Sequence, residues 1–239
     1  MNALSSKLAG DFPIFAADRV IRTALEEDIG DGDVTTLATV PAGAETKAFV
    51  WAKEDLRVAG LPAFVRVFER LAPTADFHWK FLVREGDDVA RGTHILECRG
   101  EARILLVGER TALNLLQRLS GIATMTARWT ELLRGTKAML IDTRKTSPGL
   151  RALEKYAVRA GGGRNHRAGL YDGVLIKENH IRACGGIKKA VQRTRLRVPH
   201  TLKIEVEVTN LTELEEALSA GADIILLDNM GLTTMGEAV

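Results

Sequence analysis

Cysteine is nearly absent from the 239-residue sequence, which contains only Cys98 and Cys184. Two isolated thiols, neither in a CxxC or Cys/His cluster, exclude a disulfide framework and a zinc site of the usual spacing. No apolar run approaches the roughly 18 residues of a membrane helix, and the N-terminus lacks the long apolar segment typical of a signal peptide. We therefore expect a soluble protein of the reducing cytoplasm.

An excess of one charge is also lacking. The chain has 33 Lys and Arg against 31 Asp and Glu, a formal net charge of +2, which does not indicate a nucleic-acid partner. No Walker motif is present and no GxGxxG follows a predicted strand, so the sequence disfavours nucleoside triphosphate hydrolysis and dinucleotide binding. The composition, 46% hydrophobic and 27% charged, is typical of a globular protein with one large domain or two small ones.

Residues 1–110 are expected to form an N-terminal α/β sandwich domain. The stretch AADRVIRTALEEDI has a helical period that ends at the turn residues near Gly30. Short alternating segments over residues 45–103 predict a small antiparallel sheet, interrupted by a helix at VFERL. A helix over residues 109–133 then leads into the second domain.

Residues 111–239 repeat the order strand, loop, helix, which is typical of parallel βα units. The predicted strands are AMLID, GVLIK, KIEVEV and IILLD. Ser147 is expected to cap the helix LRALEKYAVRA, and Asn210 with Glu213 resembles a capping box before another helix. The predicted fold class is α/β, and the second domain is an α/β barrel that is incomplete as given, because eight strands need about 250 residues.

Charged side chains gather where these four strands end. Residues 142–177 hold eight cations against three anions, a local charge of +5, whereas from Thr201 onward one lysine stands against eight acids, a charge of −7. Barrel enzymes build their sites at the carboxyl ends of the strands, so the pattern predicts a site there, although solvated helix faces are an alternative explanation. The strand-end charges are Arg144, Lys145, Lys177, Glu207 and Asp228.

The segment KIEVEV places Ile204, Val206 and Val208 on one face and Glu205 and Glu207 on the other. In a barrel one face points inward, and an inward carboxylate costs several kcal/mol unless it is paired or hydrated. A polar cavity follows, with Glu207 preferred to Glu205 because it is nearer the end of the strand. The alternative is an exposed antiparallel strand.

A rim that carries both arginines and carboxylates restricts the ligand. Arginine binds carboxylate or phosphate through two N–H groups, and the carboxylates would repel a bare anion. The carboxylates therefore indicate a divalent cation, sugar hydroxyls or both. Phosphate, sugar and magnesium together point to a sugar-phosphate or nucleotide reaction.

Five motifs, in order along the chain, resemble the quinolinate phosphoribosyltransferase family. They are ALEEDIGDGDVTT, GERTALNLLQRLSGIAT, DTRKTSPGLRALEKYAVRAGGGRNHRAGLYDGVLIKENH, IEVEV and IILLDN, and the likeness runs from about Ala24 to Asn229. A related family, the molybdenum-transport-associated ModD-like proteins, shares TRKT and the glycine triplet. The segments KYAVRAGGGRNHR and LIKENH resemble the quinolinate family instead.

The resemblance implies transfer of phosphoribose from 5-phosphoribosyl-1-pyrophosphate to the ring nitrogen of quinolinate, with release of carbon dioxide and pyrophosphate. It also implies Mg²⁺ bound through the donor and water, with no direct protein ligand. It further implies a homodimer, or a higher assembly of dimers, in which Arg110 reaches the partner's site. The implied site residues are Arg110, Arg144, His166 and Arg167 for quinolinate, and Lys145, Lys177, Glu207 and Asp228 for the donor, its ribose and its magnesium shell.

One departure from the family is the end of the chain at Val239, soon after the fourth predicted strand. The family continues through further strands whose loops hold the 5-phosphate of the donor, so we expect a truncated barrel or a form without that phosphate pocket. A non-catalytic anion or metabolite binder is therefore an alternative. Nucleic-acid binding through residues 142–177 is another, disfavoured because Glu207 and Asp228 would face the same phosphates.

Overall fold

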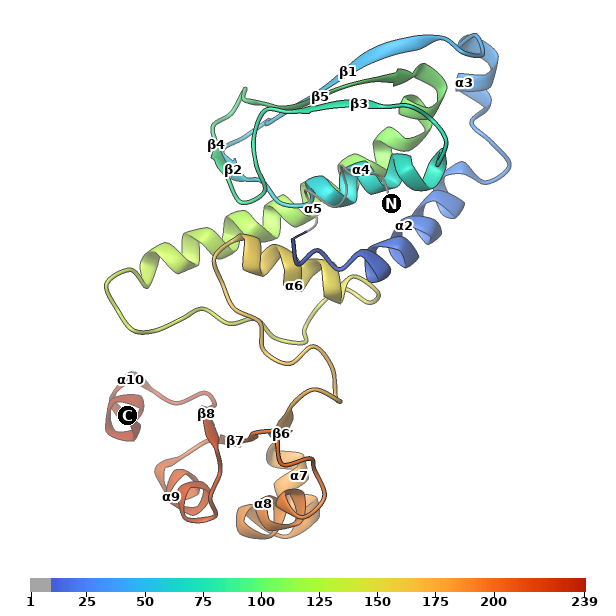
Figure 1. Ribbon diagram of the computed structural model, residues 1–239. Helices are drawn as coiled ribbons and strands as arrows, with labels where there is room; N and C mark the ends of the chain where they lie inside the picture. The colour runs from blue at the N-terminus through green and yellow to red at the C-terminus, as the bar shows by residue number, and fades with distance from the viewer. Residues whose placement is uncertain (1–9) are drawn as a thin grey trace. The chain divides into compact units, whose positions relative to one another are not determined.

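The structure is a computed structural model that describes residues 10–239 (Figure 1). The chain forms two compact units, which divide between His166 and Arg167. The predicted domain boundary between residues 110 and 111 lies inside the long helix α5 (Ala102–Leu132) and remains a prediction. No helix within residues 10–239 is long and apolar enough to cross a membrane.

The first unit begins with two helices set by their local sequence. Helix α2 (Ile14–Ile29) buries residues at helical spacing on one side and ends at Gly30, whose φ of 51° is in the left-handed region that glycine tolerates. This end confirms the predicted one. Helix α3 (Val34–Thr39) follows after Asp33, whose carboxylate accepts the backbone N–H of Thr36 at 2.9 Å.

The first unit contains the predicted antiparallel sheet, which covers two helices. Its strand order is β1 (Glu45–Trp51), β5 (His94–Glu101) and β3 (His78–Phe81), and β2 (Leu56–Arg57) pairs separately with β4 (Asp88–Val89). The sheet lies over α4 (Leu61–Leu71) and α5 (Figure 1). Between these layers the ring of Trp79 contacts those of Phe64 and Phe68 at centroid distances of 6.0 and 5.4 Å.

Two predictions about the C-terminal part of the first unit are wrong. Helix α6 is Arg151–Ala160, and Ser147 does not cap it, because residues 147–150 form a turn in which the N–H of Leu150 donates to the carbonyl of Ser147. The segment AMLID is also not a full strand. Among residues 10–239, Ile141 makes only an isolated parallel bridge with Arg164. Two backbone hydrogen bonds support it, from the N–H of Asp142 to Arg164 and from the N–H of Arg164 to Leu140.

The second unit contains three of the four predicted strands. Strands β6 (Val174–Ile176), β7 (Ile204–Val208) and β8 (Ile224–Leu227) pair in parallel in that order. The parallel pairing overturns the alternative of an exposed antiparallel strand at KIEVEV. The helices of this unit are α7 (Glu178–Cys184), α8 (Ile187–Arg195), α9 (Leu211–Ser219) and α10 (Leu232–Ala238).

Strand β7 separates an apolar face from an acidic one, as its sequence predicts. Ile204, Val206 and Val208 are fully buried in a core to which α8 and α9 contribute. Glu205 and Glu207 alternate with them along the strand. The fold is thus an N-terminal sheet domain followed by a C-terminal region of parallel βα units. Over residues 10–239 these strands form an open three-stranded sheet, not a closed barrel.

Candidate active site

Three predicted site residues of the second unit lie at the carboxyl ends of the parallel strands. Lys177 directly follows β6, Glu207 lies near the end of β7, and Asp228 directly follows β8. The strand register makes Lys177 and Asp228 neighbours of the end of β7, because Ile176 pairs with Val206 and Leu227 pairs with Val208. The predicted gathering of charge at the strand ends is therefore confirmed for these three side chains.

Two of these side chains form an ion pair. Lys177 Nζ lies 3.0 Å from Glu207 Oε2, and half of the lysine side chain remains exposed while the glutamate is 14% exposed. The backbone N–H of Lys177 donates to His180 Nδ1 at 2.9 Å, which holds the start of α7. Asp228 accepts a hydrogen bond from the side-chain amide of its neighbour Asn229. A cation and two carboxylates are thus held at the rim of the sheet.

Arg167 lies in the loop that leads into β6. Its Nη1 donates to the carbonyl of Gly173 at 3.0 Å. The carboxylate of Asp172 accepts the backbone N–H groups of Ala168 and Gly169, at 2.7 and 2.8 Å. These local hydrogen bonds give the loop a defined turn and hold the Arg167 guanidinium at the Gly173 carbonyl.

Arg144 and Lys145 occupy the loop between the Ile141 bridge and α6 in the first unit. The Nε atom of Arg144 is buried and has no hydrogen-bond partner within the described residues. A buried donor without an acceptor is costly, so this guanidinium suits an incoming carboxylate or phosphate. Lys145 is exposed, and its backbone N–H donates to Thr143 Oγ1 at 3.0 Å.

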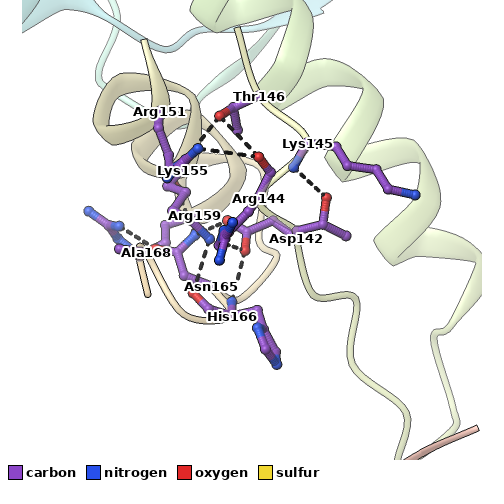
Figure 2. Close-up of polar contacts among 12 residues, drawn as sticks. Asp142, Arg144, Lys145, Thr146, Arg151, Lys155, Arg159, Asn165, His166 and Ala168 are labelled. Carbon is purple, nitrogen blue, oxygen red and sulfur yellow. Dashed lines mark hydrogen bonds and ion pairs between the residues drawn. The ribbon is translucent and has the colours of Figure 1, made fainter. Parts of the chain in front are cut away.

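His166 is held near this loop by the carboxylate of Asp142 (Figure 2). Asp142 Oδ1 accepts the backbone N–H of His166 at 2.8 Å, and Asp142 Oδ2 accepts Nδ2 of Asn165 at 2.7 Å. Lys155 Nζ on α6 lies 2.5 Å from Asp142 Oδ1 and 3.0 Å from the carbonyl oxygen of His166. The structure thus links the segments that carry Arg144 and His166.

The far end of the same loop is anchored to α5 and α6. Arg151 Nε donates to Thr146 Oγ1 at 3.1 Å, and Glu154 Oε2 accepts the backbone N–H of Ser147 at 3.3 Å. Arg118, on α5, bonds both Glu154 and Ser147. The arginine and lysine of the loop therefore project from a backbone that is restrained on both sides.

Arg110 lies on α5 with an exposed side chain, in the same unit as Arg144 and His166. Its contribution to a partner's site remains a prediction.

Comparison with known proteins identifies the family. The sequence model described as "Quinolinate phosphoribosyl transferase, N-terminal domain" matches residues 33–120, and the one described as "Quinolinate phosphoribosyl transferase, C-terminal domain" matches residues 122–239. The chain belongs to the quinolinate phosphoribosyltransferase family. The resemblance given by the five sequence motifs is therefore confirmed.

Individual relatives agree with this assignment. The nicotinate-nucleotide pyrophosphorylase (carboxylating) of Mycobacterium leprae is 44% identical over 223 residues, which cover 93% of this chain and 78% of that protein. The crystal structure of NadC from Streptococcus pyogenes is 43% identical with a TM-score of 0.90, over 96% of this chain and 80% of that one. The nicotinate-nucleotide pyrophosphorylase of Francisella tularensis has a TM-score of 0.89 at 41% identity, over 95% of this chain and 79% of that one.

The family resemblance implies magnesium bound through the phosphoribosyl donor and water, and this stays a prediction. Among residues 10–239 no group of three or more His, Cys, Asp or Glu side chains is placed to hold a metal ion directly. Glu207 and Asp228 are the carboxylates at the rim of the sheet, and carboxylate oxygens suit the water shell of Mg²⁺. Magnesium therefore remains a prediction, made for the substrate complex.

Sequence reasoning missed the residues that hold the basic loop, namely Asp142, Lys155, Asn165 and Glu154. Glu154 and Lys155 were counted only as part of the local charge of residues 142–177, yet both are at least 90% buried. One signal was available. The two charged residues lie within the apolar stretch around Leu153 and Tyr156, and a buried charge inside an apolar helix face implies a specific partner.

Proposed function

We propose that this chain catalyses phosphoribosyl transfer from 5-phosphoribosyl-1-pyrophosphate to quinolinate, with decarboxylation, to give nicotinate mononucleotide in NAD biosynthesis. The observation that carries the proposal is the match of both family domains along one chain, over residues 33–120 and 122–239. The M. leprae relative, at 44% identity, is named for this carboxylating pyrophosphorylase reaction. The arginines and lysines of both units suit the anionic groups of quinolinate and the phosphoribosyl donor.

Quinolinate is a pyridine with two adjacent carboxylates, and we assign these to Arg144, His166 and Arg167, with Arg110. The buried Nε of Arg144 supports the assignment, because a desolvated guanidinium gains most from an anionic acceptor. His166 has a fixed backbone, since Asp142 accepts its N–H. Two carboxylates match a group of three or four cationic or cation-capable side chains better than one carboxylate does.

The donor is assigned to Lys145, Lys177, Glu207 and Asp228. The leaving pyrophosphate and the ring carbanion left by decarboxylation are both negative, and lysines stabilise such charge. Glu207 and Asp228 favour the positive charge that develops on the sugar, and they face the magnesium shell that arrives with the donor. No covalent intermediate with the protein is required, so positioning and electrostatics supply the catalysis.

The assembly is proposed to be a homodimer of a cytoplasmic protein. Arg110 is exposed on α5, which leaves its guanidinium available to a neighbouring chain. In such a dimer each site takes one arginine from the partner, so the isolated chain has an incomplete quinolinate pocket.

The test compares two pyridine acids as substrates. The protein is given quinolinate or nicotinate with 5-phosphoribosyl-1-pyrophosphate and Mg²⁺, and nicotinate mononucleotide, pyrophosphate and carbon dioxide are measured. Quinolinate should be preferred by about 100-fold or more in kcat/KM, because nicotinate lacks the second carboxylate and leaves part of the assigned cationic group, including the buried Nε of Arg144, without an anionic partner. Carbon dioxide should equal the nucleotide formed.

Two results would contradict the proposal. Comparable product from nicotinate, or product without carbon dioxide, would overturn the substrate while leaving phosphoribosyl transfer in place. Binding of the donor without any release of pyrophosphate would favour a non-catalytic metabolite binder.

A further inference from the structure

A buried polar cluster lies between the two segments of the first unit that carry Arg144 and His166. It consists of Asp142, Lys155 and Asn165 (Figure 2). The side chain of Lys155 is 5% exposed and that of Asp142 is 10% exposed. Neither charge is therefore placed at the protein surface to meet a ligand from solvent.

Each member of the cluster bonds more than one segment. The Asp142 carboxylate accepts from Lys155 Nζ, from Asn165 Nδ2 at 2.7 Å and from the backbone N–H of His166 at 2.8 Å. Lys155 Nζ also donates to the carbonyl oxygen of His166, at 3.0 Å. His166 is thus held at both its N–H and its carbonyl by one ion pair.

The same cluster sets the start of the Arg144 loop. Asp142 is two residues before Arg144, and its backbone N–H donates to the carbonyl of Arg164 at 3.0 Å. Asn165 Nδ2 donates in addition to the carbonyl oxygen of Lys155 at 2.9 Å, which ties the His166 segment to α6. A shift of Asp142 therefore moves both the Arg144 segment and the His166 segment.

We propose that Asp142, Lys155 and Asn165 are positioning residues that fix the spacing between Arg144 and His166, and so set the affinity for the two carboxylates of quinolinate. The inference rests on the proposed function for the roles of Arg144 and His166. The three positioning residues are assigned no contact with substrate and act through Arg144 and His166. Their effect is to hold two carboxylate-binding side chains at one separation, which a dicarboxylate with fixed geometry requires.

The experiment separates positioning from stability by measuring KM and Kd for quinolinate. Loss of folded protein lowers the apparent kcat, whereas KM and Kd do not depend on the amount of active enzyme. In Asn165→Ala the ion pair is kept, so the chain should fold. We expect KM and the calorimetric Kd for quinolinate to rise about tenfold or more.

A second variant removes both charges together. The double variant D142L/K155M replaces the ion pair by apolar side chains of similar size, which avoids an unpaired buried charge. The midpoint of thermal unfolding should fall only modestly, because Asn165 Nδ2 and the N–H of His166 lose their acceptor, while KM and Kd for quinolinate rise as in Asn165→Ala. A KM for quinolinate equal to that of the wild type in this variant would overturn the inference.

A matched control uses another ion pair in the first unit. Arg66 on α4 bonds both carboxylate oxygens of Asp18 on α2, at 2.6 and 2.8 Å, and its side chain is 15% exposed. Arg66→Met should lower the unfolding midpoint and leave KM for quinolinate unchanged. A rise in KM equal to that of Asn165→Ala would show that any loss of stability has this effect, and would overturn the inference.

The proposed function and the inference fail in different ways. A wild-type chain that neither binds quinolinate nor converts it overturns the function, and the inference with it. An active wild-type chain beside an Asn165→Ala chain whose KM and Kd match those of the wild type overturns the inference alone.

Discussion

The ammonium of Lys177 lies 3.0 Å from a carboxylate oxygen of Glu207, and this contact joins the carboxyl ends of the neighbouring strands β6 and β7. The pair is only partly buried, because half of the lysine side chain is exposed. Glu207 is only 14% exposed, so a shift of the lysine away from it would leave a largely buried carboxylate without this partner. The exposed half of the lysine side chain is the part that is open to solvent.

The first prediction concerns the contribution of Lys145 and Lys177 to kcat. Lys177→Ala or Lys145→Ala should lower kcat about 100-fold or more, and should change quinolinate binding much less, because both lysines are proposed to stabilise charge that grows in the transition state. Steady-state kinetics and calorimetric titration measure the two effects. Lys188→Ala, which removes an exposed lysine on α8, is the control and should keep wild-type turnover. Unchanged kcat in both site variants would remove their catalytic role.

The second prediction concerns assembly. An Arg110→Ala chain and a Lys177→Ala chain, each of low activity, should recover part of the wild-type rate when mixed, because a hybrid dimer contains one site with both side chains intact. Subunit exchange is followed with two differently tagged chains. Proven exchange without any recovery would show that Arg110 acts in its own chain or has no role in the reaction.

The third prediction concerns the glycine triplet after α6. A Cβ atom on Gly161 would lie 2.5 Å from the Cβ of Thr126 and 2.6 Å from the backbone oxygen of Ala123, both on α5. Gly161→Ala should therefore destabilise the fold by about 1–3 kcal/mol, because the backbone of α5 has to move. The free energy of unfolding in urea measures the loss.

Gly121 provides the matched control for this substitution. It lies within α5, and a Cβ there would meet no heavy atom of the described residues within 4 Å apart from its chain neighbours and the backbone of its own helix. Gly121→Ala should stabilise the fold by up to about 1 kcal/mol, because alanine has the higher helix propensity. Equal effects of the two substitutions would contradict the close packing of Gly161.

The fourth prediction concerns pH. The hydrogen bonds from Arg66 hold the pKa of Asp18 below its ordinary value of 3.8. The Asp18 carboxylate binds a proton more readily in the unfolded chain than in the folded one. Its stabilising effect is therefore complete above pH 3.8 and is lost as the pH falls through the lowered pKa. Asp18→Asn should cost about 1 kcal/mol at neutral pH and progressively less in acid. Urea unfolding at a series of pH values checks this, and a cost that stays constant with pH would contradict it.

Local sequence signals were sufficient for most of the elements. The period of α2 and the turn residues near Gly30 placed that helix end, and alternation identified the antiparallel sheet of the first unit. Asn210 caps α9 as predicted, since its side chain accepts the N–H of Glu213. Such features depend on residues a few positions apart, which is why the sequence reveals them.

Two predictions failed where distant residues decide the outcome. The extended segment at Ile141 needs a ladder of hydrogen-bonded partners to become a strand, and within residues 10–239 its one bridge is to Arg164. Ser147 has the side chain of a helix cap, but its N–H and hydroxyl bond Glu154 and Arg118, and the helix starts later at Arg151. Tertiary contacts outweighed local propensity at both positions.

The sequence by itself determined the family, the βα order and the charged residues at the strand ends, because these depend on residue type and spacing along the chain. Only the tertiary structure decided which charges pair and which are buried. Lys155 and Lys177 belong to the same cationic segment of the sequence, yet one is enclosed with Asp142 and the other is half exposed beside Glu207. The physical reason is that burial and partners come from chain segments brought together by folding, and spacing along the sequence does not encode them directly.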